Sequence, residues 1–272
     1  MTELRTTDDL DRVFQGMFPA GPGREPFRFS PPQLAAVTAP VDRPSVIIAG
    51  AGSGKTTVMA ARVVWLVGHH GIAPERILGL TFTNKAAAEL GVRIRRSLTA
   101  LDVEADGEPT TSTYHAFAGT LIAEHGLRLG IEPDLRILSD ASRFQRVAQA
   151  IESYDRPLLE VTTSVPRLVG DVMALDGQLS EHLVTTDELR AFDTALIASL
   201  QAADKHYAVQ DAGIAAAHKR TELSRLVDRY RKAKAAAGVM DFSDQMAWGA
   251  ELSAVTEVAE SLRERYDVVL LD

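Results

Sequence analysis

The chain has 272 residues, of which 46% are hydrophobic and 24% are charged, a balance that excludes a fibrous or wholly disordered protein. It contains no cysteine, which excludes disulfides and cysteine-ligated metal centres within these residues. Its net charge of −8 argues against nucleic-acid binding by bulk charge alone, although a local basic groove stays open.

The N-terminal segment indicates a cytoplasmic protein. Residues 1–13 are charged and lack the apolar region of a secretory signal. No stretch approaches the roughly 18 apolar residues that a transmembrane helix needs, so no membrane partner is expected. We interpret residues 1–28 as an N-terminal extension, with a short helix over 8–18 followed by a linker rich in proline and glycine.

Apolar strand patterns alternate with helical patterns from residue 43 to residue 129. Ser45–Ile48 predicts a first strand that is buried on both faces. The elements that follow are a helix over 55–67, a strand over 77–82, a helix capped by Asn84, a weaker strand over 109–113 and a helix over 116–129. This alternation predicts an α/β fold, with helices on both faces of a parallel sheet.

The pattern becomes helical from residue 130 to residue 238. Ser139 can cap one helix, Thr185 and Glu188 have the spacing of a capping box, and Gly238 can end a third helix. The α/β pattern then returns with a helix over 243–265 and a strand over 268–271. We therefore expect a discontinuous α/β domain, residues 29–129 and 239–272, interrupted by a helical subdomain over 130–238.

The last helix of this insertion is strongly basic. Between residues 219 and 234 it has two acidic residues and seven basic ones. The basic residues are Lys219, Arg220, Arg225, Arg229, Arg231, Lys232 and Lys234. Such a run is either a solvated helix face or a local patch for nucleic acid.

A glycine-rich segment, AGAGSGKT, directly follows the first predicted strand and begins a helix. It has the phosphate-loop pattern G-x-x-x-x-G-K-[ST], except that Ala49 stands in the first position. Glycines allow main-chain N–H groups to approach phosphate oxygens, Lys55 can meet the β- and γ-phosphates, and Thr56 can offer its hydroxyl to Mg²⁺. The segment predicts a site for ATP and Mg²⁺ formed by Ala49, Gly50, Ala51, Gly52, Ser53, Gly54, Lys55 and Thr56.

The strand Val268–Leu271 leads into Asp272. An aspartate at the carboxyl end of a buried strand, near a phosphate loop, is the usual second ligand of Mg²⁺ in such sites. We predict Lys55 and Asp272 as catalytic residues, and Thr56 and Asp272 as the metal ligands.

Further motifs indicate which kind of P-loop protein this is. In order along the whole chain, the sequence resembles the UvrD/Rep/PcrA group of superfamily 1 DNA helicases. The segments that carry the resemblance are Phe29–Val37 (the Q motif), Ala49–Thr57 (motif I), Leu80–Ala87 (motif Ia), Thr113–Phe117 (motif Ib), Val239–Asp244, and Val268–Asp272 (the start of motif II).

The resemblance implies a RecA-like P-loop domain with a helical insertion, in which Gln33 reads adenine and Thr57 lies at the nucleotide. It implies an ATP-driven helicase, moving 3′ to 5′ on single-stranded DNA and unwinding duplex at junctions in repair or replication. A C-terminal RecA-like domain of the same protein is the expected partner. The DNA-binding residues that it implies are Thr81, Phe82, Thr83, Asn84, Lys85, Thr113 and His115. Stacking of one base on an aromatic ring such as Phe82 contributes roughly 1–3 kcal/mol.

Departures from the family pattern are few. Ala116 stands where the family often has serine or glycine, and Thr57 stands where some members have arginine, which implies one missing nucleotide contact. The catalytic carboxylate and arginines of the family fall after Asp272, so we expect this chain alone to bind ATP and Mg²⁺ and hardly to hydrolyse ATP.

Other functions stay open at this point. The motor can belong to a helicase–nuclease of the RecB or Adn type, or the chain can be a nucleotide-dependent DNA-binding scaffold without turnover. A small-molecule kinase is a remote alternative, because the segments TFTNKAAAE and VMDFSD have no role in one.

Overall fold

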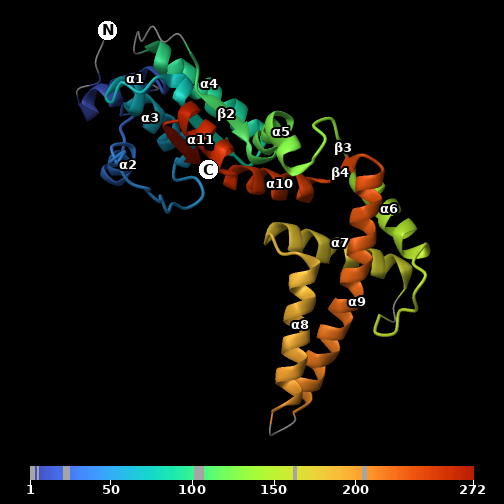
Figure 1. Ribbon diagram of the computed structural model, residues 1–272. Helices are drawn as coiled ribbons and strands as arrows, with labels where there is room; N and C mark the ends of the chain where they lie inside the picture. Colours follow the sequence, from blue (N-terminus) through green and yellow to red (C-terminus); the bar gives the residue numbers. More distant parts are fainter. Residues whose placement is uncertain (1–3, 5, 21–24, 101–106, 162–163, 204–206) are drawn as a thin grey trace. The chain divides into compact units, whose positions relative to one another are not determined.

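The computed structural model describes residues 4, 6–20, 25–100, 107–161, 164–203 and 207–272 (Figure 1). The chain divides into two compact units. We call residues 1–117 with 256–272 the strand unit, and residues 118–255 the helical unit. None of the described helices is long and apolar enough to cross a membrane.

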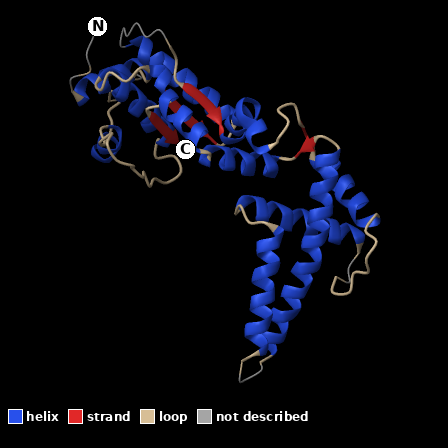
Figure 2. Cartoon of the chain, in the orientation of Figure 1, coloured by secondary structure: helices blue, strands red, loops and turns tan. Residues whose placement is uncertain are grey.

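The strand unit contains a three-stranded parallel sheet, drawn in red in Figure 2. Its strands are β1 (Ile77–Thr81), β2 (Thr110–Thr113) and β5 (Val268–Leu271), in the order β2-β1-β5. All five residues of the central strand β1 are buried, as expected of a strand with neighbours on both sides and covered faces. The predicted strands at these places, and their parallel arrangement, are confirmed.

Helices cover this sheet. They are α1 (Thr7–Met17), α2 (Pro31–Val37), α3 (Lys55–Gly68), α4 (Asn84–Ala100), α11 (Thr256–Arg265) and the first turn of α5 (Tyr114–His125), with a short 3-10 turn, η1 (Pro74–Arg76). Residues 58–67 of α3 are all buried, and Leu66 packs in one core with Phe14 of α1 and Leu90 of α4. Helix α3 is therefore central to this unit, which fixes the direction of the glycine-rich loop that precedes it.

The prediction of a first strand over Ser45–Ile48 is wrong for this structure. These residues form no strand, and Val46 and Ile48 are 88% and 97% exposed. Among the described residues, β5 pairs only with β1, and its Val269 and Leu271 are more than half exposed. An apolar run predicts burial, but a short strand is stable only beside a neighbour, and this segment has none here.

Two helix ends differ from the prediction. The side chain of Thr83, and not that of Asn84, caps α4, because Thr83 Oγ1 accepts a hydrogen bond from the N–H of Ala86 at 3.1 Å. Asn84 is the first residue of the helix itself. The single helix predicted over 243–265 is two helices, since Val255 has an extended ψ of 126° after α10 (Phe242–Ala254). The adjacent β-branched residues Val255 and Thr256 favour such a break.

The helical unit contains α6 (Asp140–Glu152), α7 (Val165–Glu181), α8 (Thr186–Gln201), α9 (Ala208–Ala236) and α10, besides the rest of α5 and the short turn η2 (Gly126–Leu129). The predicted caps of α6 and α8 are present, and Gly238 follows α9 with a φ of 59°. Helices α8 and α9 run side by side as a long hairpin (Figure 1).

One small sheet in this unit was not predicted. Strands β3 (Arg136–Ile137) and β4 (Val239–Met240) form a parallel pair that is separate from the main sheet. With two residues each, these strands are too short to give a sequence pattern.

Candidate nucleotide and nucleic-acid site

The glycine-rich loop turns into α3 through two left-handed residues. Gly52 and Gly54 have φ values of 76° and 87°, a region that residues with a side chain rarely adopt. A Cβ on Gly54 would also lie 3.3 Å from Nε2 of Gln33. No side chain caps the N-terminus of α3. The N–H groups of its first turn are therefore available to an anion such as a phosphate.

Lys55 lies at the first position of α3 and folds back over the loop. Its Nζ donates hydrogen bonds to the main-chain oxygens of Ala49 at 3.3 Å and Gly50 at 3.1 Å. The side chain remains exposed. The Lys55 ammonium thus lies against the main chain of the loop and is exposed, so it can also meet a phosphate bound there.

Gln33 joins the helix α2 to this loop. Its Oε1 accepts from the N–H of Ser30 at 2.9 Å, and its Nε2 donates to the main-chain oxygen of Ser53 at 3.0 Å. The far end of α2 is held by the buried Arg62 of α3, which donates to the main-chain oxygens of Val37 and Pro40 at 2.7 and 3.2 Å. Burial lowers the pKa of Arg62. Sequence reasoning missed this arginine, because an Arg inside an apolar helix has no pattern of its own.

The two threonines after Lys55 differ in their surroundings. Thr57 Oγ1 accepts a hydrogen bond of 2.7 Å from Arg93 of α4, so this hydroxyl links two helices. The Thr56 hydroxyl makes no hydrogen bond with the residues that the structure describes. Thr56 is therefore the hydroxyl of the pair that remains open to a metal ion.

The oxygen atoms available at this site are of the kind that binds Mg²⁺. This ion is usually held by one or two protein oxygens together with phosphate oxygens and water, and Thr56 and the exposed Asp272 offer a hydroxyl and a carboxylate. The described residues contain no cluster of three or more His, Cys, Asp or Glu side chains that could hold a metal by themselves. The metal would accordingly need phosphate oxygens as further ligands.

The carboxyl ends of the three parallel strands meet at one edge of the sheet. Phe82 follows β1, Thr113 ends β2, and Asp272 follows β5. The N–H of Asp272 donates to the main-chain oxygen of Leu80 at 2.9 Å, and the hydroxyl of Tyr114 donates to the main-chain oxygen of Asp272 at 3.1 Å. Burial, and then the nearby charge of Asp272, raise the pKa of Tyr114. Tyr114 was not among the predicted site residues, although it lies between two of them.

Some of the predicted DNA contacts are accessible. Phe82 is 80% exposed, which is unusual for an aromatic residue directly after a buried strand. The side chain of Lys85 is 86% exposed and lies 3.9 Å from Glu89 one turn later. Thr83 and Asn84 are exposed as well. These four residues form one continuous polar and aromatic surface at the start of α4.

The other predicted contacts are more enclosed. Thr81 is fully buried and donates to the main-chain oxygen of Thr83 at 3.2 Å. Thr113 is buried, and its Oγ1 accepts from the N–H of Ala116 at 3.1 Å, which caps α5. His115 is half-buried. These hydroxyls shape the edge of the sheet, whereas Phe82 and Lys85 are the groups that extend from it.

The basic run of α9 is mostly paired inside the helical unit. Lys219 pairs with Asp171, Arg220 with Asp193, Arg229 with Ser153, Arg231 with Asp176, and Lys234 with three aspartates. Only Arg225 and Lys232 of the run are exposed and unpaired among the described residues. The charge of this helix therefore contributes mainly to internal packing.

The segment VMDFSD ends in a buried ionic cluster. Lys234 Nζ lies 3.4 Å from Asp176 Oδ2, 2.9 Å from Asp241 Oδ2 and 2.7 Å from both oxygens of Asp244. Asp241 and Asp244 also form the capping box of α10. Burial alone would lower the pKa of Lys234, but the three carboxylates outweigh it and raise this pKa. The segment thus anchors the start of α10 to the end of α9.

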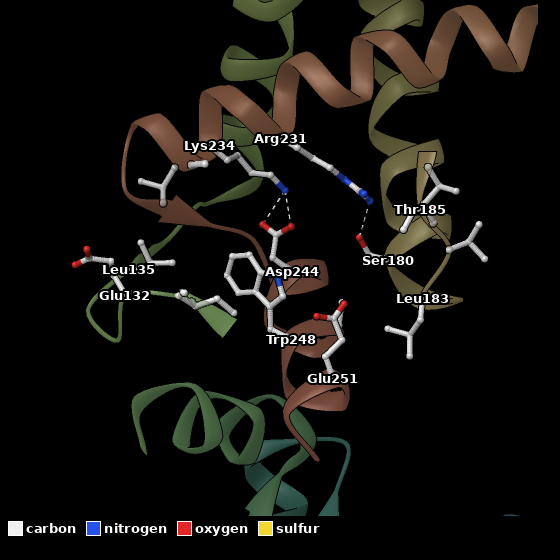
Figure 3. A pocket seen from close by; sticks show the side chains of 17 residues that line it. Glu132, Leu135, Ser180, Leu183, Thr185, Arg231, Lys234, Asp244, Trp248 and Glu251 are labelled. Atoms are coloured by element: carbon white, nitrogen blue, oxygen red, sulfur yellow. Dashed lines mark hydrogen bonds and ion pairs between the residues drawn. The ribbon is translucent and has the colours of Figure 1, made fainter. Parts of the chain in front are cut away.

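A pocket of about 320 Å³ lies over one side of this cluster (Figure 3). Figure 3 shows Lys234 bonded to Asp244 on one wall, and Arg231 directed toward Ser180. Trp248 and Glu251 of α10 lie on the same side as Asp244. The charges of Lys234 and Asp244 are paired within the cluster, and the pocket is lined by both polar and apolar side chains.

Together, a phosphate loop before a central helix and a parallel sheet whose strand ends carry Phe82 and Asp272 define a P-loop nucleotide-binding domain of the RecA-like class. The chain belongs to the family described as UvrD/REP helicase N-terminal domain, which it matches over residues 29–272.

Individual relatives carry consistent names. The chain is 26% identical over 278 aligned positions, all of its length, to the "ATP-dependent DNA helicase UvrD1" of Mycobacterium leprae, covering 30% of that protein. It is 33% identical over 121 residues to the "DNA helicase II" of Escherichia coli, which is 44% of this chain and 16% of that protein. It is 39% identical over 112 residues to the "Probable DNA helicase" of Mycoplasma pneumoniae, which is 41% of this chain and 20% of that protein. The chain thus spans less than a third of these relatives.

Proposed function

We propose that this chain is the ATP-binding N-terminal part of a DNA helicase, which couples ATP hydrolysis to 3′–5′ movement on single-stranded DNA and to duplex unwinding in repair or replication. The observation that carries the proposal is the arrangement of Lys55 over the phosphate loop, together with the exposed Phe82 at the strand ends of the same unit. The names of the relatives support the same function.

In the proposed nucleotide site, the N–H groups from Gly50 to Thr56 and the Lys55 ammonium bind the phosphates. Thr56 and Asp272 hold Mg²⁺, which neutralises phosphate charge and orients the phosphoryl group when it is bound. Gln33 lies beside the loop at Ser53, where its amide can reach a base. Thr57 contributes through its main chain, because its hydroxyl is used by Arg93.

In the proposed DNA site, the ring of Phe82 stacks on one base, and the start of α4 binds the adjoining phosphates. Lys85 supplies a full charge, and Thr83 and Asn84 supply polar groups at a helix N-terminus, where an anion is favoured. Such contacts recognise a single strand without regard to its sequence. The proposed partners are therefore single-stranded DNA and its junctions with duplex, and a C-terminal RecA-like domain of the same protein. We propose a cytoplasmic location.

The DNA-binding part is tested by the anisotropy of a fluorescent single-stranded oligonucleotide titrated with the chain. Phe82→Ala is expected to weaken binding about tenfold, because a stacked base is worth roughly 1–3 kcal/mol. Phe192→Ala is the matched control, since Phe192 is also an exposed aromatic residue, on α8. An unchanged affinity for Phe82→Ala, or an equal loss for Phe192→Ala, would contradict this DNA site.

A further inference from the structure

A polar groove lies between β3 and α6 in the helical unit, and none of its lining residues belongs to the candidate nucleotide or DNA site. Its volume is about 390 Å³. It is lined by β3 and the two residues that follow it, by one face of α6 and by Val239 of β4. The residues that line it are Arg136, Ile137, Leu138, Ser139, Ser142, Gln145, Arg146, Gln149 and Val239.

The groove is positively charged in a chain that is negatively charged overall. Arg136 and Arg146 both line it, and neither guanidinium has an ion-pair or hydrogen-bond partner among the described residues. None of the lining residues is acidic, whereas the whole chain has a net charge of −8. Asp140, at the start of α6, does not line the groove and lies 3.9 Å from Arg143. The two arginines differ in this respect from the paired basic residues of α9.

The polar side chains of α6 form a single stripe along the groove. Ser142, Gln145, Arg146 and Gln149 are spaced by three, four and seven residues, so they lie on one face of the helix. From Ser142 to Gln149 this stripe extends about 10 Å along the helix axis. Because the phosphates of one strand are spaced by about 3.4 Å along the duplex axis and farther apart through space, the stripe is long enough to contact about two successive phosphates.

We infer that this groove binds the phosphodiester backbone of nucleic acid, as a second contact surface besides Phe82. Arg136 and Arg146 supply two charges with the fork-shaped donors that suit phosphate oxygens, and the serine and glutamine side chains supply neutral hydrogen bonds. Such a surface fixes the position of the strand without reading its sequence. This inference rests on the proposed function, because it assumes that DNA is the ligand.

The test compares two pairs of substitutions that remove the same charge. Arg136→Gln with Arg146→Gln removes the charge of the groove, while Arg225→Gln with Lys232→Gln removes two exposed, unpaired charges from α9 of the same unit. DNA affinity is measured over a range of salt concentrations, with single-stranded and duplex oligonucleotides. Two lost phosphate contacts should reduce the slope of log K against log salt by about 1.4 for a single strand or about 1.8 for duplex.

The expected result is a reduced slope for the groove pair, an unchanged slope for the α9 pair, and a slope restored by Arg136→Lys with Arg146→Lys. Equal slopes for the two pairs would overturn the inference. A second contradicting result is possible. If calorimetry shows that inorganic phosphate binds and needs both arginines, while the salt slope for DNA binding is the same in the groove pair as in the wild type, the groove is a small-anion site and the inference is overturned. A wild-type chain that binds no DNA would overturn this inference and the proposed function together. Sensitivity to Phe82→Ala alone would overturn only the inference.

Discussion

The side-chain amide of Gln33 donates to the main-chain oxygen of Ser53 at 3.0 Å, which ties helix α2 to the phosphate loop. The same side chain accepts from Ser30, so both of its ends are used within the strand unit. A residue proposed to recognise the base therefore also supports the loop that is proposed to bind the phosphates. Recognition of the base and the shape of the loop are coupled through one amide.

Gln33→Ala should accordingly weaken ATP binding in two ways, by removing a base contact and by releasing Ser53. One or two hydrogen bonds of about 1 kcal/mol each predict a loss of about fivefold to thirtyfold. Calorimetry with a non-hydrolysable ATP analogue measures it, and Gln201→Ala, an exposed glutamine at the end of α8, is the control. Equal affinities for the two variants would show that Gln33 is only a helix-capping residue.

The exposed segment Val46–Ile48 should become ordered when nucleotide binds. Its apolar side chains and the outer edge of β5 are both uncovered, and pairing the two would bury both. Hydrogen–deuterium exchange should show slower exchange of the amides at 46–48 and in β5 after an ATP analogue and Mg²⁺ are added. Fast exchange at 46–48 in both states would refute this prediction. Ile48→Asp should prevent the change, while Val209→Asp, another exposed apolar residue, should not.

Lys234 should be essential to the stability of the helical unit. Lys234→Met removes the cation that Asp176, Asp241 and Asp244 share; Arg231 still faces Asp176 and Arg143 still faces Asp241, but Asp244 loses its ion pair. Removing one partner of a buried pair usually costs about 3–5 kcal/mol. Lys232→Met, two residues away on the exposed side of α9, should cost less than about 0.5 kcal/mol. Urea unfolding of both variants measures the difference. Similar midpoints would mean that the cluster contributes little.

The same cluster predicts a loss of stability at alkaline pH. Burial raises the pKa of Tyr230 to about 12, with Asp241 accepting its hydrogen bond and Arg143 and Lys234 beside it. Because this pKa is raised on folding, the stabilisation is complete below the unfolded value of about 10 and is lost as the pH rises toward 12. The unfolding free energy of the wild type should therefore fall more steeply between pH 9 and 11.5 than that of Tyr230→Phe. Parallel curves would contradict this assignment.

The sequence predicts those elements whose signal is local. The glycine loop, the capping box at Thr185 and Glu188, and the strands β1, β2 and β5 are all confirmed, because each has its own pattern. Ser45–Ile48 fails because a strand depends on a distant neighbour, and no local pattern reports whether that neighbour is paired. The break at Val255 and the cap at Thr83 are small shifts at helix ends, where propensities are weakest.

The candidate site shows the same division. Lys55 and Thr56 follow from the loop motif, but the roles of Arg62, Arg93 and Tyr114 depend on contacts between separate elements. The basic run of α9 is a sharper case. The sequence contains seven basic residues in this run. Only the structure shows that most of them pair with aspartates from α7, α8 and α10. A basic residue in a sequence therefore does not show whether an acidic residue from another helix pairs with it.

The most direct test of the account is ATP binding by Lys55→Ala. Calorimetry with a non-hydrolysable ATP analogue and Mg²⁺ should show one site in the wild type, and about a hundredfold weaker binding in Lys55→Ala, because the ammonium over the loop meets the β- and γ-phosphates. Lys232→Ala, which removes an exposed lysine of α9, should bind as the wild type does. Equal affinity of the wild type and Lys55→Ala, or no binding by the wild type, would contradict the claim that this loop is a nucleotide site.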